Sequence, residues 1–308
     1  MLKWKPKSQI AIWAIDPFEG KLRPHRFEVR NLLAWTKATG VKIQPVYILK
    51  LELSRLTSTE QVEVRASKID EMESAIGDYL QEIGCTDTLA PRVLVVSEGA
   101  VENMVESLIN YSDESDAKMI IVSSRGRKGF DRFIFGSFAE TLLLKSTKPL
   151  YFLTHQIGTL LAERNKVLFA TDFSKNSESA FKVLLEQAKS SSSEIILYCA
   201  IALPSSLIIA PDDFYSQEEA TVKAKAQEWI EKANSEGVKL NLVIQYVGSP
   251  SNVAQSIIDL AKQKGARFVA MASSSGKMAS FIFGSVAREV FRANLFPVWI
   301  CGPHNIAS

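Results

Sequence analysis

Residues 124–137 carry the side chains and glycines of an anion-binding loop. This segment contains Arg125, Gly126, Arg127, Lys128, Gly129, Gly136 and Ser137. It follows an apolar run, 119–122, that predicts a buried strand, and it precedes a predicted helix over 138–145. Glycines let the backbone approach an oxygen atom, and a helix N-terminus presents unpaired N–H groups. The pattern predicts a phosphate site, and the alternative is a surface turn with solvated cations.

An aspartate follows the first predicted strand. Asp16 comes directly after the apolar run 10–15, and a second predicted strand covers 41–49. The carboxyl ends of parallel strands meet at one edge of a sheet, and ligands bind there. Asp16, the end of the second strand and the loop 123–129 could therefore line one crevice. The alternative is that Asp16 only caps a local turn.

The composition is that of a globular protein and excludes several classes of function. Hydrophobic residues make up 46% of the chain and charged residues 23%, with a net charge of +2. Such a balance gives no basis for nucleic-acid binding. The longest uncharged stretch, 195–211, is interrupted by Pro204, so no membrane span is expected. Three isolated cysteines and three scattered histidines predict no zinc site and no disulfide, which favours the reducing cytoplasm.

Strands and helices alternate along the whole chain. The first half has expected strands at 10–15, 41–49, 92–97, 119–122 and 149–153, with helices at 27–39, 60–83, 101–111 and 138–145. The second half has expected strands at 166–171, 194–199, 241–247, 266–272 and 297–301, with helices at 178–190, 218–233, 253–262 and 285–292. This alternation predicts parallel sheets with helices on both faces.

The two halves repeat each other. Residues 133–137, Phe-Ile-Phe-Gly-Ser, recur as 281–285 at an offset of 148, while Asp16 and Asp172 differ by 156. The first copy is thus eight residues longer, and the extra length is expected around 18–26 and before the helix at 60. The repeat predicts two tandem doubly wound α/β domains, each with a five-stranded, mainly parallel sheet. We expect domains at 1–155 and 166–308, joined by a linker at 156–165.

The motifs resemble those of the universal stress protein family in its tandem form. The family has an Asp after the first strand and Gly-x2-Gly-x9-Gly-Ser/Thr after the fourth. The signature positions are Ser123, Gly126, Gly136 and Ser137 in the first copy, and Met271, Ser274, Gly284 and Ser285 in the second. The first copy is the more complete, since two of four positions differ in the second. The resemblance implies adenine nucleotide alpha hydrolase-like domains packed as an intrachain pseudo-dimer.

The resemblance also implies a ligand and the residues that hold it. In members that bind ATP, the Asp contacts the adenosine and the end of the second strand offers backbone groups to adenine. Carried over, this implicates Asp16 and Ile48, with the phosphates held by Gly126, Arg127, Gly129, Gly136 and Ser137. ATP, with Mg²⁺ accompanying it, is the implied cofactor. The implied role is a cytoplasmic sensor or binding module of the stress response that could also have protein partners or form a homodimer.

Two other functions remain open from the sequence. One is an interaction scaffold without a nucleotide site, in which the apolar stretch 200–211 contacts a partner or an apolar ligand. The Gly-Ser pairs would then be plain helix N-caps. The other is an enzyme, at most a slow ATP hydrolase or a nucleotidyl transferase. A transferase of this class needs a His-x-Gly-His signature, and none of the three histidines stands in such a context.

Overall fold

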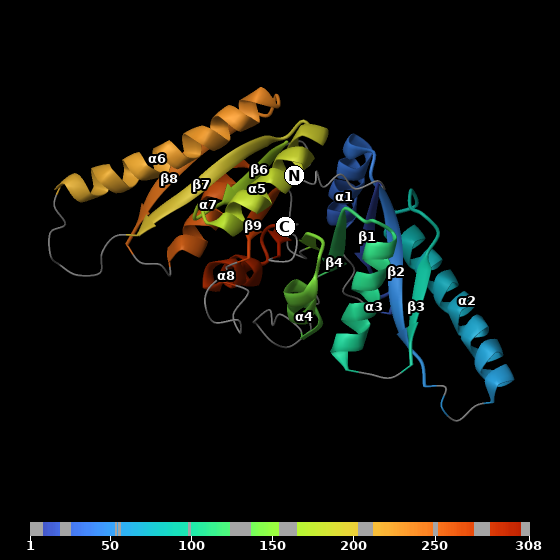
Figure 1. The fold of residues 1–308 in the computed structure, drawn as a ribbon. Coiled ribbons are helices and arrows are strands. Elements are labelled where there is room, and N and C mark those ends of the chain that lie inside the picture. The colour runs from blue at the N-terminus through green and yellow to red at the C-terminus, as the bar shows by residue number, and fades with distance from the viewer. Residues whose placement is uncertain are drawn as a thin grey trace. The chain divides into compact units, whose positions relative to one another are not determined.

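The computed structural model describes residues 9–18, 26–52, 54, 57–97, 100–123, 137–153, 165–202, 212–248, 252–273 and 284–302. The chain divides into two compact units. The first comprises Met1–Ile157 with Ala307–Ser308, and the second comprises Gly158–Ile306. Figure 1 labels their helices and strands.

The first unit alternates strands and helices in the expected order. Its elements are β1 (Ile10–Ala14), α1 (Arg26–Thr39), β2 (Lys42–Lys50), α2 (Ser58–Glu82), β3 (Arg92–Val96), α3 (Val101–Glu114), β4 (Met119–Ser123), α4 (Ser137–Lys145) and β5 (Leu150–Leu153). The strands lie in the order β3-β2-β1-β4-β5, and all the pairs are parallel. The strand order reverses between β1 and β4, which is the point where doubly wound sheets bind ligands.

The second unit has the same architecture. Its elements are β6 (Lys166–Ala170), α5 (Lys175–Ser190), β7 (Glu194–Ala202), α6 (Asp212–Ser235), β8 (Leu240–Val247), α7 (Val253–Lys264), β9 (Phe268–Ala272), α8 (Ser285–Ala293) and β10 (Val298–Cys301). The order β8-β7-β6-β9-β10 is again wholly parallel, with the reversal between β6 and β9. The predicted fold class is therefore confirmed, while the pseudo-dimer packing and the domain boundaries remain predictions.

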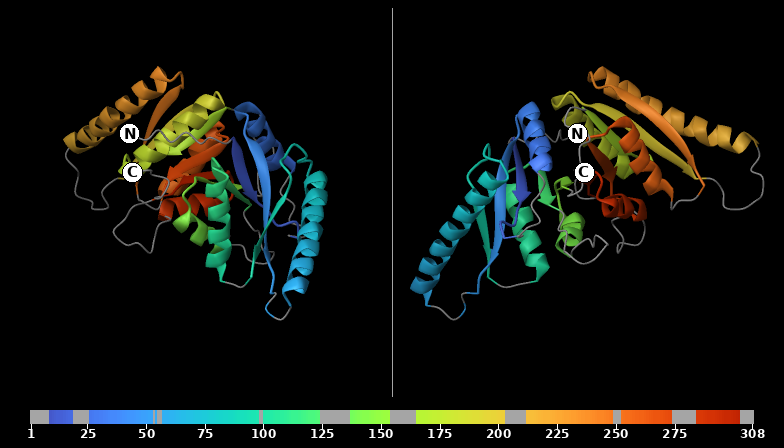
Figure 2. Two further views of the ribbon diagram at one scale, coloured as in Figure 1. Left: turned by 45° about the vertical axis from the view of Figure 1, so that its right-hand side comes forward. Right: turned by 180° about the vertical axis from the view of Figure 1, so that it is seen from behind.

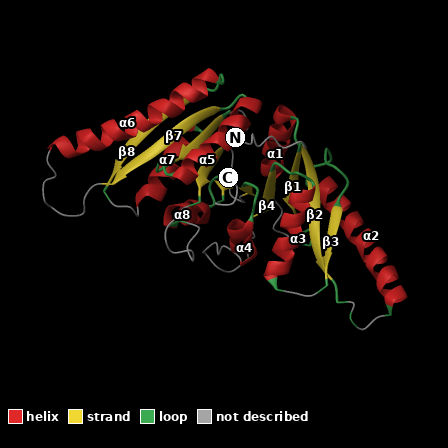
Figure 3. Ribbon diagram, in the orientation of Figure 1, coloured by secondary structure: helices red, strands yellow, loops and turns green. Residues whose placement is uncertain are grey.

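In both units helices cover the two faces of the sheet, as the separate colours of helix and strand in Figure 3 and the two views in Figure 2 show. Right-handed crossovers account for this layering, because the connections on opposite sides of the reversal point lie on opposite faces. Ligands of doubly wound sheets bind at the carboxyl ends of the strands. The connections at those ends are the segments that can carry a site.

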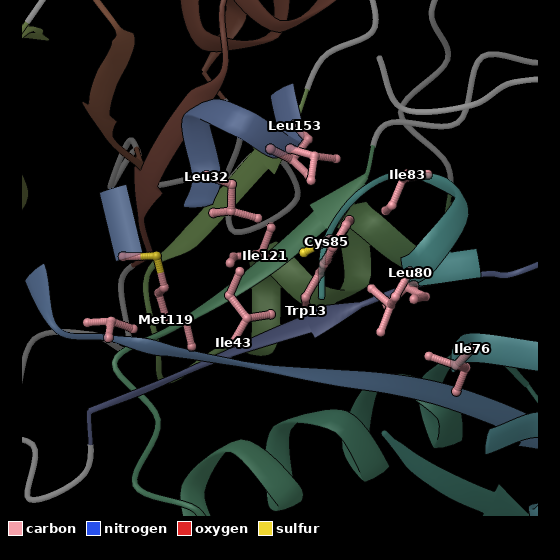
Figure 4. Packing of buried hydrophobic residues seen from close by; sticks show 14 residues of the cluster. Trp13, Leu32, Ile43, Ile76, Leu80, Ile83, Cys85, Met119, Ile121 and Leu153 are labelled. Carbon is pink, nitrogen blue, oxygen red and sulfur yellow. The ribbon is translucent and has the colours of Figure 1, made fainter. Parts of the chain in front are cut away.

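Alternate residues of the strands build the core of the first unit. Trp13 of β1, Ile43 of β2 and Ile121 of β4 are fully buried and face Leu32 of α1 and Leu80 of α2 (Figure 4). Side chains alternate between the faces of a strand, so residues two apart share this one apolar layer. The layer fixes the sheet register and therefore the level at which each strand ends.

Two helices begin three or more residues earlier than the sequence pattern predicts. Helix α5 begins at Lys175 because the Ser174 hydroxyl accepts a hydrogen bond from the N–H of Ser177 at 3.3 Å and caps the helix. Helix α6 begins at Asp212, six residues before the expected start at Glu218. Strand β7 continues to Ala202, pairing with β8 to its end. Capping and strand pairing, which apolar periodicity does not report, account for the added lengths of α5 and β7.

Candidate functional site

Asp16 lies at the carboxyl end of β1. The N–H of Ile15 donates to the carbonyl of Val46 at 2.9 Å, so the pairing with β2 continues one residue beyond β1. Asp16 follows at once, and its Oδ1 accepts the N–H of Phe18 at 3.0 Å. This bond is a local turn of the kind that aspartate favours. The residue thus closes a turn at the edge of the sheet where the crevice was expected.

Ile48 offers backbone groups beside the end of β1. In a parallel ladder, alternate residues direct both their N–H and their C=O to the same neighbour. Val46 directs its groups toward β1, since its carbonyl accepts from Ile15. Ile48, two residues later, directs its groups to the same side, beyond the last β1 pair, Ala14 with Val46. Continued by two residues, that register brings Asp16 level with Ile48.

The phosphate end of the predicted site is described only at its last residue. Ser137 is the exposed first residue of α4, as the motif requires. Gly126, Arg127, Gly129 and Gly136 belong to 124–136, which lies outside the described residues. Helix α4 also carries Glu140 in its first turn. That carboxylate stabilises the helix but opposes an anion at the same terminus.

The matching aspartate of the second unit accepts hydrogen bonds from two serines. Oδ1 of Asp172 accepts the N–H of Ser174 at 2.9 Å and the hydroxyl of Ser177 at 2.6 Å. Partial burial favours the neutral carboxyl, but the hydrogen bonds from Ser177 and Ser174 outweigh it and lower the pKa of Asp172. Asp172 therefore organises the turn between β6 and α5.

Apolar side chains pack at the strand ends of the second unit. Cys199 and Ile201 of β7 form a buried cluster with Val222 of α6, and Phe173 packs against it. The Phe173 ring lies 4.9 Å from that of Trp229, with its backbone in the left-handed region at φ 55°. The N–H of Thr171 donates to the carbonyl of Tyr198 at 2.9 Å, as the N–H of Ile15 does to that of Val46. Ala200, two residues after Tyr198, is therefore the counterpart of Ile48. The sequence analysis did not predict this packing, because nothing in the Asp-Phe-Ser motif at 172–174 indicates that Phe173 contacts α6.

The register also corrects the match between the two signatures. Ala14 pairs with Val122, and its counterpart Ala170 pairs with Met271. Met271 therefore corresponds to Val122, and Ser123 corresponds to Ala272. The constant offset of 148 instead matches Ser123 with Met271. The connection before α8 is consequently one residue shorter than the connection before α4. A fixed spacing between motifs cannot detect such a change at a loop.

Polar contacts also close the end of β9. The Asn176 side chain of α5 donates to the carbonyl of Ser273 at 3.0 Å, and the N–H of Ser273 donates to the carbonyl of Cys301 at 2.9 Å. The Ser273 hydroxyl is buried and makes no hydrogen bond within the described part of the chain. These contacts hold α5, β9 and β10 together at the carboxyl edge.

Two further features bear on the chemistry of the described residues. A groove of about 410 Å³ lies between β3 and α3, lined by Leu94, Asn103, Glu106, Asn110, Tyr111 and Glu114. It contains none of the predicted site residues, and Glu106 forms an ion pair with Lys145 at 2.6 Å. Within the described ranges, no group of three or more His, Cys, Asp or Glu residues is arranged to hold a metal ion, and no helix is long and apolar enough to cross a bilayer.

Comparison with solved structures identifies the fold. A universal stress protein from Archaeoglobus fulgidus matches with a TM-score of 0.63 and 20% identity, covering 96% of this chain and 99% of that one. A protein from Pseudomonas aeruginosa described as a universal stress protein matches with a TM-score of 0.60 and 13% identity, over 97% and 95% of the two chains. Another Archaeoglobus fulgidus universal stress protein, solved in complex with dAMP, matches 44% of this chain with 95% of its own, at 20% identity and a TM-score of 0.33.

Sequence comparison gives the family. No curated protein matches this sequence. The model of the universal stress protein family matches twice, over residues 29–153 and 163–302, which is most of the chain. Each match falls on one of the five-stranded units, and the full-length structural matches have the same fold. The chain belongs to the universal stress protein family, in the tandem two-domain form.

Proposed function

We propose that the first unit binds ATP or a related adenine nucleotide and that the protein acts as a cytoplasmic binding module or sensor of the stress response. The observation that carries the proposal is the level of Asp16 beside Ile48, next to the reversal point of the sheet. A carboxylate can accept hydrogen bonds from both ribose hydroxyls. An N–H and a C=O on one side of a strand can pair with an adenine edge.

The phosphates would lie against the connection between β4 and α4. Gly126, Gly129 and Gly136 would admit the backbone close to the phosphate oxygens, and Arg127 would add a cation. The Ser137 hydroxyl, at the first residue of α4, would donate to a phosphate. Mg²⁺ would enter with the nucleotide and neutralise part of the phosphate charge. We assign it no protein ligand.

The second unit is a poorer candidate for the same ligand. Asp172 already accepts hydrogen bonds from Ser174 and Ser177, and releasing it would leave the hydroxyl of Ser177, which is 3% exposed, without that partner. Its connection before α8 keeps Gly284 in the place of Gly136 but has no glycine at the positions of Gly126 and Gly129. We therefore expect one nucleotide per chain, bound in the first unit.

A matched pair of variants tests this assignment. Titration calorimetry with ATP and Mg²⁺ should give a stoichiometry near one for the wild type. Asp16→Asn keeps the shape and removes the charge, so the affinity should fall by about tenfold, the usual value of a charge-assisted hydrogen bond. Asp172→Asn makes the same change in the second unit and should leave the affinity unchanged. Gly126→Val and Gly136→Val should abolish binding.

Three outcomes would contradict the proposal. Wild type that binds no ATP at millimolar concentration would favour the scaffold without a nucleotide site. Equal losses of affinity in Asp16→Asn and Asp172→Asn would show that the two units are not distinguished as we propose. Turnover of ATP faster than release of the bound nucleotide would replace the binding module with an enzyme.

A further inference from the structure

Strand β8 ends the sheet of the second unit with a long outer edge. It is the last strand in the order β8-β7-β6-β9-β10, and it pairs with β7 over all eight of its residues without a bulge (Figure 1). An edge strand of this kind presents a row of backbone N–H and C=O groups that can pair with another strand. Which residues present them follows from the ladder with β7.

The ladder shows that four residues direct their backbone outward. The N–H of Ile195 donates to the carbonyl of Lys239 at 2.8 Å, so the odd-numbered residues of β8 direct their groups to β7. The even-numbered residues direct theirs away from β7, to the side where no described strand pairs with β8. These residues are Leu240, Leu242, Ile244 and Tyr246.

The corresponding edge of the first unit is protected, and β8 is not. Strand β3 is only five residues long, begins with a charged residue, Arg92, and is preceded by Pro91. Strand β8, Leu-Asn-Leu-Val-Ile-Gln-Tyr-Val, contains neither charge nor proline. Val46 pairs with Arg92 and its counterpart Tyr198 pairs with Val243, so the charge of β3 stands where β8 has a valine. Charge, proline and short length are the usual means by which an edge avoids pairing.

We propose that β8 pairs antiparallel with β8 of a second copy of this chain, about a twofold axis at Val243. An antiparallel strand pair is compatible with twofold symmetry, and β8 is self-complementary in this register. Leu240 would lie opposite the partner's Tyr246, and Leu242 opposite the partner's Ile244. Each such pair would exchange two hydrogen bonds. Strand β8 shares no residue with the proposed nucleotide site, and the inference does not depend on that site.

The side chains of β8 fit this pairing. On the face of β8 toward α7, where Gln245 is hydrogen-bonded to Ser256, Val243 would lie against the partner's Val243. Asn241 would lie against the partner's Gln245. On the other face Ile244 packs near α6, and Tyr246, which is 45% exposed, bonds to Glu219 of α6. Because β8 has no charged residue, no like charges of the two strands oppose each other. A contact one strand wide buries little area, so we expect a weak, concentration-dependent dimer.

Charge reversal at the twofold axis tests the pairing. Sedimentation velocity of the full chain should show a species of twice the 34.2 kDa monomer mass that grows with concentration. Val243→Lys and Val243→Glu each place like charges about 5 Å apart across the axis and should weaken the dimer on the order of tenfold to a hundredfold. An equimolar mixture of the two variants should restore it, because opposite charges then face each other.

The matched control is Leu94→Lys, which puts the same charge on a half-buried apolar residue in the middle of β3. It should leave the dimer unchanged, and circular dichroism should show each variant folded. Wild type that stays monomeric at 100 µM or more would overturn the proposal. So would a dimer that persists in both single variants, which would locate the interface elsewhere. A mixture that fails to recover would equally exclude the twofold axis at Val243.

Discussion

The carboxylate of Asp172 stabilises the β6–α5 turn, and this contribution can be removed without changing the shape of the side chain. Asp172→Asn keeps an acceptor oxygen for Ser174 and Ser177 but removes the charge. Hydrogen bonds to an ionised group are worth about 1.5–3 kcal/mol, roughly twice those to a neutral one. Two such bonds are affected, and water screens the partly exposed carboxylate. We therefore expect a loss of about 1 kcal/mol, or about a fivefold increase in the opening constant of the turn.

The loss should depend on pH with a definite sign. The hydrogen bonds lower the pKa of Asp172 in the folded chain, so the contribution is fully present above the pKa of the unfolded chain, about 4. It should disappear as the pH falls through the lower folded pKa. Wild type and Asp172→Asn should therefore differ at pH 7, and the difference should shrink as the pH falls below about 4 and Asp172 is protonated.

Hydrogen exchange followed by mass spectrometry measures this turn separately from the first unit. Peptides covering 171–190 report the opening of the turn and of α5. Ser177→Ala removes one donor, and the double variant should cost less than the sum of the two single variants. If Asp172→Asn exchanges like the wild type at pH 7, or if the difference does not shrink as the pH falls below about 4, the account of the carboxylate is wrong.

Two more predictions concern the cores. Ile76→Ala removes a side chain that is fully buried between α2 and the sheet, so urea denaturation should show about 3 kcal/mol less stability, while an unchanged midpoint would contradict the packing. Burial raises the pKa of Cys85 and of Cys301 to about 12 and that of Cys199 to about 11. At pH 8 the folded chain should therefore react slowly with iodoacetamide, whereas the urea-unfolded chain should react at all three thiols. Rapid labelling of the folded chain would refute this.

Periodicity predicted the strands and helices because the core imposes it. The buried part of β4, residues 119–122, is a continuous apolar run, and α2 shows apolar residues at helical spacing with Met72, Ile76 and Leu80 buried. The doubly wound class followed from the alternation of strands and helices and from the repeat. Helix starts were less accurate, because the Ser174 cap that fixes α5 depends on a single hydroxyl.

The site could be predicted in part. The sequence predicted the place of Asp16 because an acidic residue directly after an apolar run lies at a strand end. It did not distinguish Asp16 from Asp172, because the partners of the latter, Ser174 and Ser177, become relevant only when α5 begins at Lys175. The roles assigned to Gly126, Arg127, Gly129 and Gly136 remain predictions.

The placement of the eight extra residues was correct only in part. Asp16 and Val46 are 30 residues apart, while their counterparts Asp172 and Tyr198 are 26 apart, so half of the difference lies between β1 and the end of β2. The stretch from Val46 to Arg92 differs by a single residue from its counterpart, Tyr198 to Val243. The expected extra length before the helix at 60 is therefore wrong. Connections can change length without disturbing the sheet, and motif spacing does not localise such changes.

The matching ladders of the two units give each unit an internal standard. The bond from Ile15 to Val46 and the bond from Thr171 to Tyr198 have the same length, 2.9 Å, and occupy the same place in their sheets. Any two positions related through these bonds are present at equal concentration, in one solvent and in one molecule. A difference between them, in exchange rate, labelling or ligand response, therefore reports the local sequence alone, and the duplicated chain serves as its own control.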